Sequence, residues 1–184
     1  VENAYFIIAA SLLFKEDIKG SKKYFTSLIE NFPNSKYNNE SMLWLSLCEF
    51  KLGNLEANTS LISNFTENKI KLNKNEKFIF NQILAEISMV ENNTESVYKH
   101  LNASLEFASN DSEKVKIYNK LITFSDLIED YTNLVIYLDK LYNLLGNERE
   151  RKDIKLLAID YHKKLDNYDY LIPEIERLLS LSSF

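Results

Sequence analysis

Apolar residues recur at helical spacing on both sides of five short polar segments. After the fourth of these segments, Leu134, Leu138, Leu141 and Leu145 form a stripe at i, i+4, i+7 and i+11. This spacing places the side chains on one face of an α-helix. Because the pattern recurs beside every polar segment, it predicts ten amphipathic helices joined as five helical hairpins.

The five polar segments recur at nearly constant intervals. Their equivalent residues are spaced by 37, 39, 37 and 37, and they are Glu16, Gly53, Asn92, Glu129 and Asp166. A period of this length is typical of stacked two-helix repeats. The sequence therefore predicts an all-α superhelix in which each hairpin buries its apolar side against the next.

The predicted layout is a single repeat domain, 1–184. Its hairpins are 1–35, 36–72, 73–109, 110–146 and 147–184. The first helices are 3–14, 38–51, 74–91, 111–128 and 148–165. The second helices are 18–31, 54–66, 94–108, 131–145 and 169–181. Residues 67–73 are the longest predicted connector. Pro173 implies either a late start or a kink in the last helix, because proline cannot donate an intrahelical hydrogen bond.

Four of the predicted helix starts have a capping-box signature. Four asparagines stand three residues before a glutamate, as a capping box requires: Asn73, Asn92, Asn110 and Asn147.

Composition supports a folded helical chain. Hydrophobic residues make up 45%, whereas only three glycines and two prolines occur, fewer than a turn-rich β-fold uses. The net charge of −5 provides no attraction for nucleic acid or anionic lipid. The longest uncharged apolar stretch, 4–14, is too short to span a bilayer. Since the chain starts at Val1, we expect a trimmed or mature form without its signal peptide or lipid-anchor segment.

The first third of the chain resembles the tetratricopeptide repeat (TPR) family. Ser21 and Phe25 stand where that family prefers a small residue and a phenylalanine, and 28–37 resembles the end of an envelope-type repeat. Residues 43–54 resemble the following first helix and turn. The most similar pattern is that of bacterial envelope TPR proteins, including TPR lipoproteins of outer-membrane protein assembly. Departures are a period above the usual 34 residues and, at the small position, Ile122 and Ile159.

The resemblance implies a non-enzymatic scaffold that holds a peptide or helix of another protein, in the bacterial envelope or periplasm rather than the cytoplasm. Small residues would let neighbouring helices approach at Ala9, Ser46 and Ala85. Large ones would fill the space between hairpins at Phe25, Ile62, Leu101, Leu138 and Ile175. The inner-face positions implied by the family register are Glu40, Leu43, Leu47, Phe50, Lys51, Gln82, Glu86, Met89, Asn119, Thr123, Asp126, Asp160 and Lys163.

No motif for catalysis, a cofactor or a metal is present in the sequence. His100 and His162 lack a second histidine or cysteine at ligand spacing, and Cys48 lies beside an apolar stripe, where a buried thiol is expected. We therefore predict no catalytic residue, no cofactor and no metal ligand. An enzyme or small-ligand binder is the less favoured alternative, and it would need a polar pocket with perturbed carboxylates.

The first helix is apolar on nearly every side, from Tyr5 to Phe14. A terminal hairpin should have a polar outer face. The helix therefore either packs against further sequence or docks a partner or a second copy, so self-association is another alternative. The stripe at 178–181 raises the same question.

Overall fold

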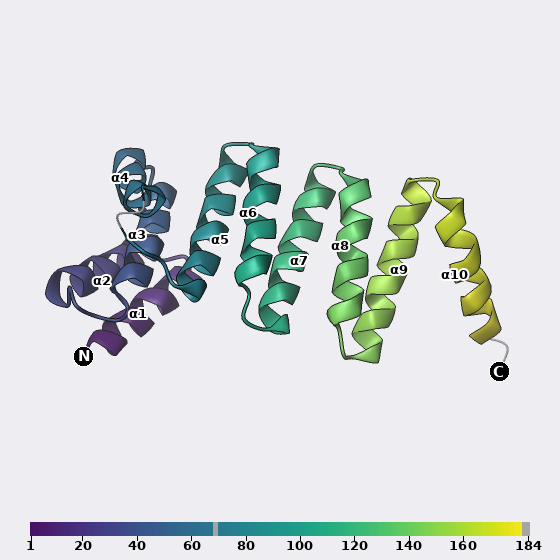
Figure 1. The fold of residues 1–184 in the computed structure, drawn as a ribbon, viewed down its shortest axis with the longest axis horizontal. Helices are drawn as coiled ribbons and strands as arrows, with labels where there is room; N and C mark the ends of the chain where they lie inside the picture. The colour runs from purple at the N-terminus through teal and green to yellow at the C-terminus, as the bar shows by residue number, and fades with distance from the viewer. Residues whose placement is uncertain (68–69, 182–184) are drawn as a thin grey trace. The chain divides into compact units, whose positions relative to one another are not determined.

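The computed structural model describes residues 1–67 and 70–181, with side chains as far as Arg177, and its described part contains ten helices and no strand (Figure 1). They are α1 (Glu2–Phe14), α2 (Ile18–Asn31), α3 (Asn38–Lys51), α4 (Leu55–Thr66), α5 (Lys74–Val90), α6 (Thr94–Phe107), α7 (Asp111–Leu127), α8 (Tyr131–Leu144), α9 (Glu148–Lys164) and α10 (Tyr168–Leu181). Every predicted helix is confirmed, with bounds that differ by at most one residue. The predicted stripe at 178–181 lies outside the described side chains. Residues 68–69 of the predicted 67–73 connector lie outside the described residues.

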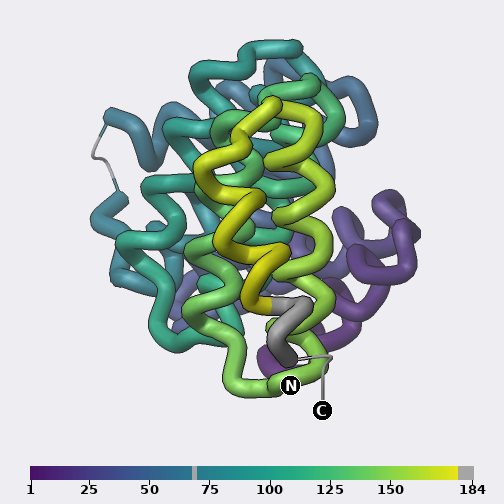
Figure 2. The backbone as a smooth tube through the Cα atoms, turned by 90° about the vertical axis from the view of Figure 1, so that its right-hand side faces the viewer, coloured from purple at the N-terminus to yellow at the C-terminus, as the bar shows by residue number. Residues whose placement is uncertain are grey.

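The chain divides into two compact units, Val1–Phe107 with three hairpins and Ala108–Phe184 with two. In the first unit, α2 packs against α1 and α3, and α3 also packs against α4 and α5. In the second unit, α8 packs against α7 and α9. Figure 2 shows α10, in yellow, beside α9. The all-α hairpin architecture is thus confirmed, whereas one continuous superhelix stays a prediction.

All five predicted joints adopt one backbone geometry. Glu16, Gly53, Asn92, Glu129 and Asp166 have φ between 51° and 78°, and no other described residue has a left-handed φ. At each joint the left-handed residue donates its N–H to the carbonyl three residues earlier. The next residue donates to the carbonyl five residues earlier, with N···O distances of 2.8–3.2 Å. This Schellman pattern satisfies the final carbonyls of the helix and reverses the chain.

The residue after each left-handed position is Asp or Asn, which starts the next helix. Asp17 Oδ1 accepts from the N–H of Gly20, and Asp130 Oδ1 accepts from that of Asn133. The joint therefore combines a helix stop and a helix start in two residues. All five joints therefore have the same length and the same backbone geometry.

The four predicted capping boxes have different outcomes. Asn73 and Glu76 form a complete box. Asn110 and Asn147 cap their helices, but the box glutamate does not return to the N–H of either asparagine. The prediction at Asn92 is wrong by one residue, because Asn92 is the left-handed residue and Asn93 accepts from the N–H of Ser96.

Pro173 lies inside α10, five residues after its first residue, so the alternative of a late helix start is wrong. The ring removes the N–H that would otherwise donate to the carbonyl of Asp169.

The core follows the repeat register. Ala9, Ser46 and Ala85 are fully buried, as predicted for the small position. Two equivalent hydrogen bonds join the helices of the first two hairpins: Ser21 Oγ donates to the carbonyl of Ala9 at 2.9 Å, and Asn58 Nδ2 donates to that of Ser46 at 2.8 Å. A small residue facing a short polar side chain therefore fixes the separation of the two helices.

The large position differs among hairpins. Phe25, Leu101 and Leu138 are fully buried, whereas Ile62 is half-buried. Ile175 is 46% exposed, so the prediction that it fills an inter-hairpin space is wrong. In the described structure it lies on the last helix of the second unit, and its side chain remains open to solvent.

Candidate functional site

A groove of about 450 Å³ opens between α1 and α3 in the first unit. Its lining comes from α1, the first joint, the start of α2, α3 and one residue of α5. We call it the α1–α3 groove, and its lining residues are Phe6, Ala10, Leu13, Phe14, Glu16, Ile18, Glu40, Trp44, Leu47, Lys51 and Glu86. Four of the predicted inner-face residues therefore line one groove.

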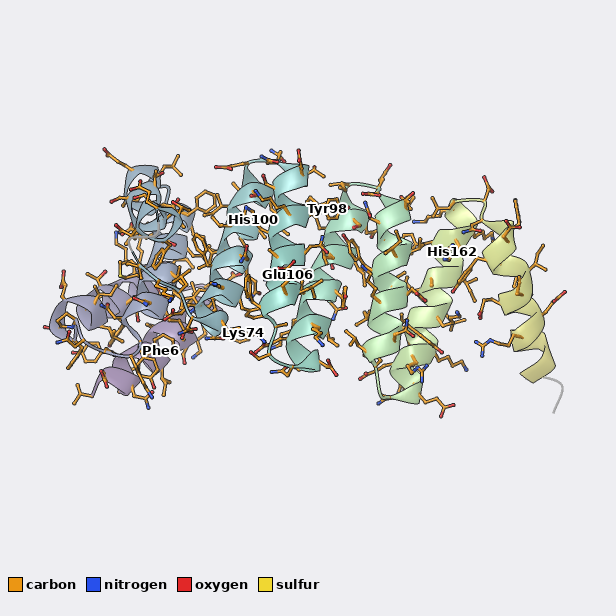
Figure 3. All side chains as sticks on the ribbon, viewed as in Figure 1. Phe6, Lys74, Tyr98, His100, Glu106 and His162 are labelled. Atoms are coloured by element: carbon orange, nitrogen blue, oxygen red, sulfur yellow. The ribbon has the colours of Figure 1, made fainter. Side chains whose placement is uncertain are left out.

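The apolar wall of the groove is held in place by aromatic contacts. The ring of Phe6, labelled in Figure 3, stacks on Tyr37 with centroids 4.7 Å apart and meets Phe25 edge-on at 6.0 Å. Phe6, Leu13 and Trp44 pack against the buried cluster around Ala9 and Phe25. Phe14, by contrast, is 91% exposed at the end of α1. The groove thus has a fixed apolar floor and a large solvent-exposed ring at its rim.

Carboxylates dominate the polar side of the groove. Trp44 Nε1 donates to Oε1 of Glu40 at 3.3 Å, and Lys51 Nζ lies 3.4 Å from Oε2 of Glu86. Burial raises the pKa of Glu40 above its ordinary value; the Trp44 hydrogen bond opposes this shift, and the nearby charge of Glu76 adds to it. Glu40 is therefore a partly desolvated carboxylate beside a second carboxylate.

The other predicted residues of the first unit lie at different depths. Leu43 is fully buried and Leu47 is only 3% exposed, so both support the groove from the core. Phe50, Gln82 and Met89 are half-buried. Among these five, Leu47 alone lines the groove.

The remaining predicted residues belong to the second unit and are exposed. They are Asn119, Thr123, Asp126, Asp160 and Lys163. Asp126 Oδ1 accepts a 2.6 Å hydrogen bond from the hydroxyl of Tyr161, which joins α7 to α9. This bond raises the pKa of Tyr161 to about 12. Asp126 therefore fastens two helices of its own unit.

The second unit contains a cavity of about 350 Å³ between α8, α9 and α10. His162, on α9 in Figure 3, stacks on Tyr170 with centroids 3.6 Å apart, and its Nδ1 lies 3.1 Å from Nδ2 of Asn167. Burial, followed by the charge of Lys155, lowers the pKa of His162. Lys155 Nζ forms a 3.0 Å ion pair with Glu174. The His162–Tyr170 stacking and the Lys155–Glu174 ion pair thus fasten α10 to α9.

Sequence reasoning missed this second cluster. Tyr170 and Glu174 are on α10, His162 and Lys155 are on α9, and no motif links them. The one available signal for His162 was its position relative to the joint. In two hairpins, the polar residue four positions before the left-handed residue contacts the asparagine at the N-cap of the next helix. Glu49 accepts from Asn54 at 2.7 Å, and His162 lies against Asn167.

Cys48 and His100 each contact a polar side chain of a neighbouring helix. Cys48 is fully buried, its Sγ lies 3.6 Å from Ser21 Oγ, and burial raises the pKa of its thiol. His100 Nδ1 lies 3.3 Å from Oδ1 of Asn81 on the neighbouring helix. Within the described ranges, no group of three or more His, Cys, Asp or Glu side chains is arranged to hold a metal ion. None of the helices in the described part is long and apolar enough to cross a membrane.

The chain matches no protein-family model, and comparison with curated proteins also finds no match. The α1–α3 groove is therefore interpreted from its own geometry.

Proposed function

We propose that this protein is a non-enzymatic interaction module that binds a segment of another protein in the α1–α3 groove. The observation that carries the proposal is the pairing of a fixed apolar floor with an almost fully exposed phenylalanine, Phe14, at the rim. A large exposed ring beside a preformed apolar groove offers the apolar contact area on which protein recognition depends.

The groove suits side chains of a helix or an extended segment. Its volume of about 450 Å³ accommodates a few side chains rather than a whole folded surface. Phe6 is fixed by Tyr37 and Phe25, so little ordering entropy is lost at that wall on binding. A segment that presents apolar residues at i and i+3 or i+4 is the partner that such a groove favours.

A TPR-type scaffold role in bacterial envelope or outer-membrane protein assembly is part of the same proposal. The support consists of five equivalent joints, the small residues Ala9, Ser46 and Ala85 at one register position, and the resemblance of the first third of the chain.

The test uses a random 12-residue peptide library displayed on phage and selected against the purified protein. We expect enriched peptides whose binding is lost in the variant Phe14→Ser, because the exposed ring supplies the rim contact. Leu127→Ser is the matched control, since Leu127 is 79% exposed at the corresponding end of α7. If enriched peptides bind the Phe14 variant as well as the parent protein, the groove is not the binding surface.

Self-association through α1 is the second candidate. Ile7 and Ile8 are 54% and 41% exposed on a helix that has one charged residue, Glu2. Sedimentation equilibrium separates this function from the first. A dimer at tens of micromolar that dissociates in Ile7→Ser would support it, whereas a monomer throughout would refute it.

A further inference from the structure

We propose that the partner segment bound in the α1–α3 groove is basic as well as apolar, with a lysine or arginine side chain seated between the aromatic wall and the carboxylates of Glu40 and Glu86. This inference rests on the proposed function, and it adds the chemical class of the partner. The groove would hold apolar neighbours of that cation against Leu13 and Phe14.

The charges that line the groove are unbalanced. Glu16, Glu40 and Glu86 contribute three carboxylates, and Lys51 contributes the one ammonium group among the described lining residues. Lys51 is paired with Glu86 at 3.4 Å. The groove therefore carries an excess of two negative charges, which attracts a cationic segment and repels an acidic one.

Glu40 is the carboxylate that gains most from an incoming cation. It is half-buried, it accepts a hydrogen bond from the neutral indole of Trp44, and the nearby charge of Glu76 on α5 is also negative. A lysine or arginine head placed beside it would offset both the partial desolvation and the repulsion between the two carboxylates. An apolar or acidic side chain in the same place would leave both costs in full.

The aromatic wall suits the same ligand. Phe6, Phe14 and Trp44 surround the groove, and a cation over an aromatic face is attracted by the ring quadrupole. This chain already makes such contacts elsewhere: Lys164 Nζ lies 4.6 Å from the ring centroid of Tyr131 and 4.4 Å from that of Tyr161. Carboxylates beside aromatic rings form a site for a cation with an apolar stem, which describes lysine and arginine side chains.

The test begins with the peptides selected above and measures their affinities by fluorescence anisotropy. We expect lysine- and arginine-rich sequences with interspersed apolar residues. Glu40→Gln and Glu86→Gln should each weaken binding by roughly two- to fivefold, the range for partly exposed ion pairs. Lys51→Gln should tighten binding by a similar factor, because it removes the groove's own cation. Glu106→Gln is the control, since Glu106 is exposed on α6 outside the groove (Figure 3).

Glu86→Gln and Lys51→Gln are expected to change the affinity in opposite directions. This difference distinguishes a charge-selective groove from general damage to its walls. Affinity that falls from 50 to 300 mM salt in the parent, and falls less in Glu40→Gln, would further support the proposal. Two results would overturn the basic partner and leave the proposed function standing. The selected peptides could need Phe14 but be acidic or neutral, or they could need Phe14 and bind all three charge variants as tightly as the parent protein. Selected peptides that ignore Phe14 would overturn both.

Discussion

Gly53 offers the most direct test of the repeated joint. Its φ is 78°, and a Cβ atom built on it meets no other atom within 4 Å. Gly53→Ala therefore adds a methyl group that nothing obstructs, so the substitution acts through the backbone alone. The left-handed conformation costs an L-residue about 1–2 kcal/mol. Removing a glycine from the unfolded chain returns about 0.4–1 kcal/mol. The difference between these two effects is a net destabilisation of roughly 0–1.6 kcal/mol.

Urea unfolding followed by tryptophan fluorescence measures this change. Trp44 is the single tryptophan, and it lies on α3 immediately before the Gly53 joint, within the same unit. Glu16→Gly should shift the same signal in the opposite direction by a similar amount, because Glu16 has a φ of 61° without being a glycine. A shift of about 1 kcal/mol corresponds to roughly 2–4 °C in melting temperature for a chain of this size.

Gly146→Ala is the control for the bare effect of replacing a glycine. Gly146 also has open space around an added Cβ, but its φ is not left-handed. We expect Gly146→Ala to stabilise the protein by about 0.4–1 kcal/mol. Urea unfolding monitored by circular dichroism measures this change. If Gly53→Ala stabilised the protein as Gly146→Ala does, the left-handed joint would not be the source of the effect, and the reasoning would be refuted.

Three further predictions concern the core and two hydrogen bonds. Leu138→Ala should destabilise the second unit by about 2–5 kcal/mol, whereas Ile175→Ala at the equivalent, half-exposed position should cost about 1 kcal/mol or less; equal costs in urea unfolding would contradict the burial difference. Asn58→Ala should lower stability by about 1–2 kcal/mol, read by tryptophan fluorescence, because it removes a buried inter-helix hydrogen bond. The raised pKa of Tyr161, about 12, means that the neutral hydroxyl is favoured in the folded state, so stability should fall as pH rises from 10 towards 12. Tyr161→Phe should show a weaker fall over that window, and an unchanged pH profile would exclude a role for the bond to Asp126.

The helices and joints were predictable because their causes are local. A helix bound depends on capping and on apolar spacing within a few residues, so the ends of α3 and α2 agree with their predicted ranges. The joint period identified five equivalent positions in advance, and all five are left-handed in the structure, although four of them are not glycine. The one-residue error at Asn92 arose because two adjacent asparagines both fit an N-cap, and only the backbone conformation separates them.

The groove was predictable in part. Family register placed Glu40, Lys51 and Glu86 on one face, and the structure brings them to the same groove. It could not anticipate that Trp44 would bind Glu40, or that Phe14 would stand open at the rim. Those features depend on how α1 lies against α3, and the sequence of neither helix specifies that alone.

By itself the sequence determined the number of helices, their bounds and the turn that repeats between them, since hydrogen bonds over three to five residues decide these features. Tertiary structure decided which apolar residues are covered among those that share a register position. Leu138 and Ile175 occupy the same register position, yet one is fully buried and the other is 46% exposed. The difference arises because burial depends on the neighbouring helix, and a residue's own segment carries no record of which helix, if any, packs over it.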